Sequence, residues 1–204
     1  MFSEPWEGQP YSMNIGVILG VRHNFLIDTG RGSGDVAPVL ELLKDSDLPL
    51  VVINTHMDYD HVWGNHCFEN CMIIAHESCR ELLDKTWDEE FEQNKHHARG
   101  EVKKCLPNVT FTDKMDFWKD GVHLLYTPGH TSTCISVYDS VDKVLYAGDN
   151  IGDTNEEILP EIHTDRATFK KLINTYESIE FDICVSGHNV PQGKDVLARL
   201  RHRF

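Results

Sequence analysis

Short apolar runs that each end in a histidine or an aspartate constrain this chain more than any other feature. Residues 48–53 (LPLVVI) are continuously apolar, as in a β-strand covered on both faces, and HMDYDH follows closely at 56–61. The same arrangement recurs further along, where apolar runs lead into His130, Asp149 and His188. Functional side chains of layered α/β folds gather in loops at strand ends. The sequence therefore predicts that these side chains share one site.

The remaining pattern alternates strand and helix signals. Residues 14–21 and 24–30 are two β-prone runs separated by a short polar break, which predicts a hairpin. Residues 35–46 fit a helix that presents Val36, Val39, Leu40 and Leu43 on one face. Strands are expected at 14–21, 24–30, 48–54, 71–76, 121–130, 133–139, 143–149 and 181–188. Helices are expected at 35–46, 77–86, 165–179 and 194–204.

These elements predict an α/β protein with two sheets face to face and helices outside. The length of 204 residues favours one domain spanning residues 1–204. Residues 86–104 are strongly polar, with Trp87 and Phe91 as their large apolar side chains. We expect this segment to form an exposed helical insertion.

Charge narrows the classes of partner. The formal net charge of −14 argues against nucleic acid and against anionic membrane surfaces, because both require a basic footprint. No apolar stretch approaches the ~20 residues that span a bilayer, and residues 1–14 lack the apolar core of a secretory signal. Six scattered cysteines then indicate reduced thiols. We expect a cytoplasmic protein with a small-molecule substrate; the sequence gives no indication of its oligomeric state.

The cluster at 56–61 has a structural and a functional interpretation. Asp58 or Asp60 could be the N-cap of a helix that starts there, but capping accounts for one aspartate and not for two histidines beside it. Imidazoles and carboxylates at this density suit zinc, iron or manganese. We therefore favour a metal site.

Other side chains near these motifs are less specific. Trp63 either lines a pocket or anchors the motif loop to the core. Asp28, in the sequence IDTG, is expected to act as a hydrogen-bonding carboxylate of a turn. His96 and His97 are expected to be solvated, unless a flap brings one of them near substrate.

The motifs together resemble the metallo-β-lactamase-fold hydrolases. The resemblance rests on FLIDTG at 25–30, H-x-D-x-D-H at 56–61, and the sequences that contain His130, Asp149 and His188. It implies a four-layer αββα sandwich with two adjacent divalent metal ions, zinc first and manganese or iron as alternatives. The implied ligands are His56, Asp58 and His130 for the first ion, Asp60, His61 and His188 for the second, and Asp149 bridging both.

Asp58 departs from the commonest pattern of that family, which has histidine at this position. A third carboxylate makes the site more neutral and favours harder ions such as manganese or iron(II). Aspartate is also short, so it could instead act through a neighbouring ligand. Three alternatives stay open: a ligand of zinc, a ligand of a harder metal, or a weakened first site.

The resemblance implies a dinuclear metal-dependent hydrolase, in which a metal-bridging hydroxide attacks an ester, a thioester or a related electrophile. Asp60 would be catalytic, by binding metal and orienting the nucleophile. An exported lactamase is disfavoured because no export signal is expected. A glutathione thioesterase of the glyoxalase II type is disfavoured because only residues 189–204 follow His188, where that branch carries a helical domain. The alternative is an iron-dependent oxidoreductase, persulfide-dioxygenase-like or diiron, on the same fold. A third possibility is a metal-binding protein without catalysis.

Overall fold

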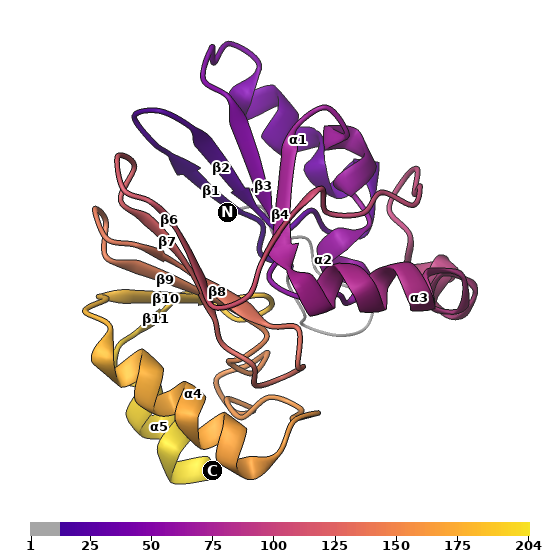
Figure 1. The fold of residues 1–204 in the computed structure, drawn as a ribbon. Coiled ribbons are helices and arrows are strands. Elements are labelled where there is room, and N and C mark those ends of the chain that lie inside the picture. The colour runs from indigo at the N-terminus through magenta and orange to yellow at the C-terminus, as the bar shows by residue number, and fades with distance from the viewer. Residues whose placement is uncertain (1–12) are drawn as a thin grey trace. The chain divides into compact units, whose positions relative to one another are not determined.

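Two β-sheets with helices alongside make up the computed structural model, which describes residues 13–204 (Figure 1). The chain divides into two compact units: residues 15–112 form unit 1, and residues 113–204 together with residues 13–14 belong to unit 2. The prediction that residues 1–14 are no secretory signal falls mainly outside the described residues. The single-domain organisation stays a prediction.

Unit 1 is built on a five-stranded sheet in the order β1-β2-β3-β4-β5. The strands β1 and β2 form the expected antiparallel hairpin, and β2 through β5 run parallel. Ile27 at the end of β2 pairs with Ile53 at the end of β3, so the residues that follow both strands emerge at the same edge. The strand bounds are β1 Gly16–Leu19, β2 Asn24–Ile27, β3 Leu50–Ile53, β4 Met72–His76 and β5 Val109–Phe111.

Strand β3 is buried within unit 1. Its residues Val51, Val52 and Ile53 are at most 1% exposed, as the continuous apolar run predicts for a strand covered on both faces. The helix bounds are α1 Ser33–Leu43, α2 Tyr59–Val62, η1 Asn65–Phe68, α3 Glu77–Asn94 and η2 Lys95–His97.

Unit 2 is built on a six-stranded sheet in the order β11-β10-β9-β8-β7-β6. The pair β9 and β10 is parallel and the remaining pairs are antiparallel. The carboxyl ends of β7, β9 and β10 therefore meet at one edge of this sheet. The bounds are β6 Lys114–Phe117, β7 Val122–Tyr126, β8 Ile135–Asp139, β9 Val144–Gly148, α4 Arg166–Ser178, β10 Ile183–Ser186, β11 Gln192–Gly193 and α5 Val196–Arg203.

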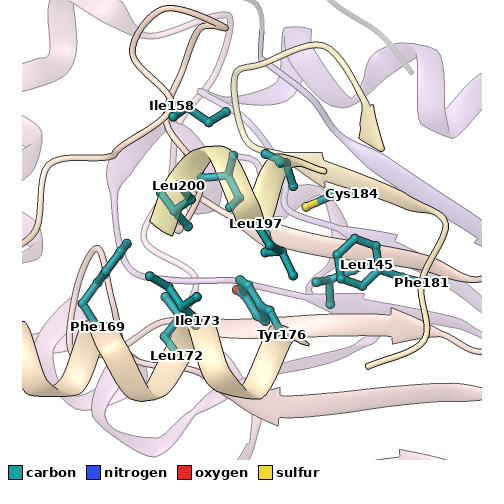
Figure 2. Packing of buried hydrophobic residues seen from close by; sticks show 13 residues of the cluster. Leu145, Ile158, Phe169, Leu172, Ile173, Tyr176, Phe181, Cys184, Leu197 and Leu200 are labelled. Carbon is teal, nitrogen blue, oxygen red and sulfur yellow. The ribbon is translucent and has the colours of Figure 1, made fainter. Parts of the chain in front are cut away.

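The core of unit 2 lies between its sheet and the pair α4 and α5 (Figure 2). Phe169 and Tyr176 of α4 are fully buried against Leu145 of β9 and Leu200 of α5. The carboxylate of Asp165 caps α4 by accepting hydrogen bonds from two backbone N–H groups of the first turn. This core fixes the strands whose ends carry the predicted ligands.

The order of the main strands and helices matches the prediction, but three short strands and one helix face differ from it. The short strands β5, β6 and β11 were not predicted, because none of them lies in an extended apolar run. Leu40 was wrongly assigned to the buried face of α1: it is 45% exposed, while Val36 and Val39 are buried. At about 100° per residue, Leu40 lies at the edge of that face.

The helical part of the polar segment 86–104 is the second half of α3 followed by η2, and residues 98–104 contain no helix. Trp87 is only 6% exposed, so one side of this helix packs into unit 1. Among residues 13–204, no helix combines the length and the apolar character that crossing a membrane requires.

Candidate metal centre

Asp28 is the hydrogen-bonding hub at the edge of the unit 1 sheet. It follows β2, is 2% exposed and has a positive φ of 62°, a conformation that aspartate tolerates better than most residues. Its carboxylate accepts hydrogen bonds from the backbone N–H of Thr55 (2.7 Å), the Thr55 hydroxyl (2.7 Å) and Nδ1 of His61 (2.8 Å). The expectation of a hydrogen-bonding turn carboxylate is confirmed.

These contacts set the protonation pattern of two buried histidines. Because an ionised carboxylate only accepts, Nδ1 of His61 must donate to Asp28, which leaves Nε2 as the ligand nitrogen. The Thr55 hydroxyl donates to Asp28, so its lone pair accepts from Nδ1 of His56 at 3.0 Å. His56 therefore also presents Nε2. Both imidazoles are 0% exposed, and their ring centroids lie 4.1 Å apart.

The two aspartates of the motif lie beside these nitrogens. Oδ2 of Asp58 is 3.5 Å from Nε2 of His56, and Oδ1 of Asp60 is 4.0 Å from Nε2 of His61. Two donors that each lie ~2.0–2.2 Å from a shared ion are at most about 4.4 Å apart. Both pairs meet that limit. Asp58 is the N-cap residue of α2, but its side chain makes no capping hydrogen bond, so capping does not explain its carboxylate.

Trp63 anchors the motif to the interior of unit 1. It is 1% exposed and packs in one cluster with Val62, Leu83 and Trp87. Its backbone N–H donates to the carbonyl of Gly30 at 3.1 Å. Of the two interpretations offered for Trp63, the anchoring one is observed.

The end of the polar segment also lies beside the motif. His97 stacks on Tyr59 with ring centroids 5.7 Å apart and an interplanar angle of 13°. Burial, reinforced by the Asp60 carboxylate, raises the pKa of Tyr59 to about 12, so this hydroxyl stays protonated at neutral pH. Burial lowers the pKa of the His97 imidazole. His97 is therefore packed against the motif loop rather than fully solvated.

In unit 2, a buried amide holds the loop that carries His130. The side chain of Asn150 is 0% exposed; its oxygen accepts from the backbone N–H of His130 (2.8 Å), and its nitrogen donates to Thr127 and Tyr176. Nδ1 of His130 donates to the carbonyl of Glu161 at 2.7 Å, which leaves Nε2 as the ligand nitrogen. Sequence reasoning did not single out Asn150, because a buried asparagine beside Asp149 has no motif signal of its own.

Asp149 and His188 follow the parallel strands β9 and β10. Oδ2 of Asp149 lies 3.3 Å from Nε2 of His188, and both side chains are 13% exposed. The structure adds a carboxylate that was not predicted: Asp153, Asp149 and His188 offer ligand atoms that all lie within 4.8 Å of one another. Asp153 also lines a cavity of about 480 Å³ in unit 2, together with Glu156, Glu157, Glu161 and Arg203 among others.

The structure thus groups the predicted residues into two sets. The unit 1 set contains the four residues of the motif, and the unit 2 set contains the three strand-end residues and, in addition, Asp153. Unit 1 offers two pairs of an imidazole and a carboxylate, His56 with Asp58 and His61 with Asp60, and unit 2 offers the group of Asp149, Asp153 and His188. Imidazole nitrogens and carboxylate oxygens at these spacings fit the divalent metal that their chemistry implies. The members are His56, Asp58, Asp60 and His61 in unit 1, and His130, Asp149, Asp153 and His188 in unit 2.

Strand-end histidines and carboxylates on two α/β units define a candidate metalloprotein. A family model described as the Metallo-beta-lactamase superfamily matches residues 8–188. The chain therefore belongs to the metallo-β-lactamase superfamily, as the motifs predicted.

Solved structures with the same fold agree. The structure of the metallo-β-lactamase TMB-1 matches with a TM-score of 0.78 and 19% identity, covering 98% of this chain and 88% of that one. A metallo-β-lactamase from Hirschia baltica matches with a TM-score of 0.71 and 17% identity, covering 98% and 90%. The predicted fold class, α/β of the metallo-β-lactamase type, is confirmed.

Several curated relatives are named as hydrolases. A hydroxyacylglutathione hydrolase from Legionella pneumophila is 27% identical over 149 residues, 68% of this chain and 50% of that protein. The chain thus spans about half the length of that relative. The human acyl-coenzyme A thioesterase MBLAC2 is 24% identical over 94% of this chain and 78% of that protein. An N-acyl homoserine lactonase from Bacillus cereus is 34% identical, over 43% of this chain and 31% of that protein.

Proposed function

We propose that this chain is a metal-dependent hydrolase of small-molecule esters, thioesters or related electrophiles, and that its two sets of ligands together bind two divalent ions. The observation that carries the proposal is the pair of fully buried imidazoles, His56 and His61, which Asp28 orients so that both present Nε2. The proposed ligands are His56, Asp58 and His130 for the first ion, Asp60, His61 and His188 for the second, and Asp149 for both.

Divalent ions held there would supply a hydroxide at neutral pH, by lowering the pKa of bound water from 15.7 toward ~7, and would polarise the substrate carbonyl. The side chains of the protein would hold the ions and orient their ligands. Asp28 and Thr55 fix the ring orientation of His61 and His56. Asp60, whose side chain is 19% exposed, is the proposed catalytic carboxylate that orients the nucleophile and accepts its proton.

Asp58 decides the choice of metal in this proposal. Zinc is the first candidate because four of the proposed ligands are imidazoles. Manganese or iron(II) are the alternatives, because oxygen ligands favour harder ions. A side-chain oxygen of Asp58 at 3.5 Å from Nε2 of His56 supports its role as a ligand over a role outside the metal's direct contacts.

The cavity in unit 2 supports an uncharged substrate over a strongly anionic one. Four carboxylates and one guanidinium are among its lining groups, and the whole chain carries a formal net charge of −14. Such a field repels the negatively charged phosphates of the coenzyme A moiety in an acyl-coenzyme A. Among the substrate types that the relatives' names indicate, we therefore propose an uncharged lactone or ester as the best accepted, a glutathione thioester next, and an acyl-coenzyme A last.

The first experiment is elemental mass spectrometry of protein purified without added metal, for the wild type and for Asp58→Ala. About two zinc or manganese ions per chain, with partial loss in the variant, is the expected result. Iron as the bound metal, with oxygen uptake in place of hydrolysis, would support an iron-dependent oxidoreductase instead. The absence of metal after reconstitution would refute the proposal.

The second experiment measures hydrolysis of a lactone, a glutathione thioester and an acyl-coenzyme A at several salt concentrations. Asp149→Ala is expected to abolish turnover, whereas Asp142→Ala, on the turn at the opposite end of β9, is expected to leave it unchanged. Retained turnover by Asp149→Ala with two metals bound would contradict the bridging assignment. Coenzyme A thioesters accepted best at all salt concentrations would contradict the proposed order of substrates.

A further inference from the structure

Asp153 is a carboxylate that neither the sequence motifs nor the family relationship assigns to the metal centre. It lies four residues after Asp149 and is partly buried. Its oxygen, an oxygen of Asp149 and a ring nitrogen of His188 lie within 4.8 Å of one another, all within unit 2. This is close to the ~4.4 Å that separates two opposite ligands of one ion at 2.2 Å.

The backbone beside Asp153 is fixed to the backbone beside His188. The carbonyl of Gly152 accepts from Nδ2 of Asn189 at 3.0 Å, and the N–H of Gly152 donates to the carbonyl of Ile158 at 2.9 Å. Asn189 is 3% exposed. A Cβ at Gly152 would overlap the carbonyl oxygen of Glu157, so this close approach requires glycine. The turn therefore holds Asp153 next to His188 through bonds independent of any metal.

We propose that Asp153 supplies a further oxygen ligand to the ion held by Asp149 and His188, and that it shifts the preference of this ion site from Zn²⁺ toward Mn²⁺. The proposal rests on the metal-dependent function proposed above. A second carboxylate raises the number of oxygen donors relative to imidazole nitrogens, and oxygen donors select harder ions. It also raises the coordination number above the four that zinc prefers in closed sites.

The cavity of about 480 Å³ suggests a second role for the Asp153 carboxylate, in contacting a bound ligand. Asp153 belongs both to the metal-binding group and to the cavity wall, so a ligand that fills the cavity would contact the same carboxylate that is proposed to bind the ion. The carboxylate that holds the metal would then also form part of the surface that meets substrate.

The test is a titration of metal-free protein with Mn²⁺ and, separately, with Zn²⁺ by calorimetry. Asp153→Asn keeps the size of the side chain and removes its charge, and Asp153→Ala removes the ligand atoms. Asp142→Asn, an exposed aspartate on the β8–β9 turn, is the matched control. We expect Asp153→Asn to weaken Mn²⁺ binding by about tenfold or more, to weaken Zn²⁺ binding less, and the control to change neither. Unchanged affinities, or an equal loss for both ions, would overturn the proposal.

Cobalt substitution gives a spectroscopic readout of the coordination number, independent of the calorimetric affinities. A five- or six-coordinate Co²⁺ ion absorbs weakly, whereas a four-coordinate one absorbs strongly. We expect a weakly absorbing ion in the wild type that becomes strongly absorbing in Asp153→Asn. Two four-coordinate ions in the wild type would overturn the proposal. If the wild type hydrolyses an ester or thioester but binds Mn²⁺ no better than Asp153→Asn does, this inference alone is refuted. If the wild type binds no metal, the proposed function is refuted.

Discussion

Asp28→Asn tests whether one buried carboxylate orients both histidines of the H-x-D-x-D-H motif. Asparagine tolerates the positive φ of 62° at this position, so the substitution changes hydrogen bonding and leaves the backbone in place. An amide in the position of Oδ2 donates where the carboxylate accepted. His61 must then accept through Nδ1, and reversal of the Thr55 hydroxyl imposes the same change on His56. Both rings would carry their proton on Nε2, the nitrogen proposed to bind metal.

The magnitude follows from the number of orienting contacts. Loss of one such contact to a ligand costs about 10–100-fold in metal affinity, or roughly 1.4–2.7 kcal/mol at 1.36 kcal/mol per tenfold. With two histidines affected, we expect affinity to fall by a factor on the order of 10²–10⁴. The metal-free protein loses acceptor capacity at one oxygen, so its free energy of unfolding falls by only about 1–3 kcal/mol.

The assay combines metal titration, urea unfolding of the metal-free protein and nitrogen-15 NMR of the imidazoles, which distinguishes the two tautomers. Asp139→Asn is the matched control: Asp139 is also buried, but the backbone N–H groups of Val141 and Asp142 both donate to its Oδ1, which asparagine retains. We expect the control to bind metal as the wild type does. Wild-type metal affinity in Asp28→Asn, or unchanged tautomers of His56 and His61, would refute the reasoning.

Four further outcomes are expected. Gly64→Ala places a Cβ onto the carbonyl oxygen of Thr29 and should cost about 1–3 kcal/mol; an unchanged urea midpoint would contradict this. Tyr176→Phe removes the hydroxyl that accepts from Asn150 and should cost about 1–3 kcal/mol, measured by the same unfolding. Burial raises the pKa of the Cys184 thiol from 9.0 to about 12; since the unfolded thiol ionises first, stability should fall as pH rises from 9 toward 12, and Cys184→Ala should flatten that slope. Chelation should lower the melting temperature, because an ion at 100 times its dissociation constant stabilises by about 2.7 kcal/mol; an unchanged melting temperature would argue against bound metal.

The strongly patterned elements could be predicted from sequence because their signals are local. The apolar run before His56 and the amphipathic helix Arg166–Ser178 are both present in the structure, the latter with its aspartate cap. The polar segment 86–104 was harder, because its few apolar side chains make contacts that depend on distant residues. Phe91, for example, packs against Trp63 with ring centroids 5.5 Å apart, and no local pattern indicates that partner.

The sequence by itself determined the family, the fold class and the order of the predicted ligands, because each ligand sits at a fixed offset from an apolar strand. Only the tertiary structure decided which neighbours orient those ligands. Asp28 lies 33 residues before His61, and Asn150 lies 20 residues after His130; strand pairing and a shared core, not chain proximity, bring each pair into hydrogen-bonding distance. Asp153 joins Asp149 and His188 for the same reason, since a turn pinned by Asn189 is a property of two segments and of neither alone.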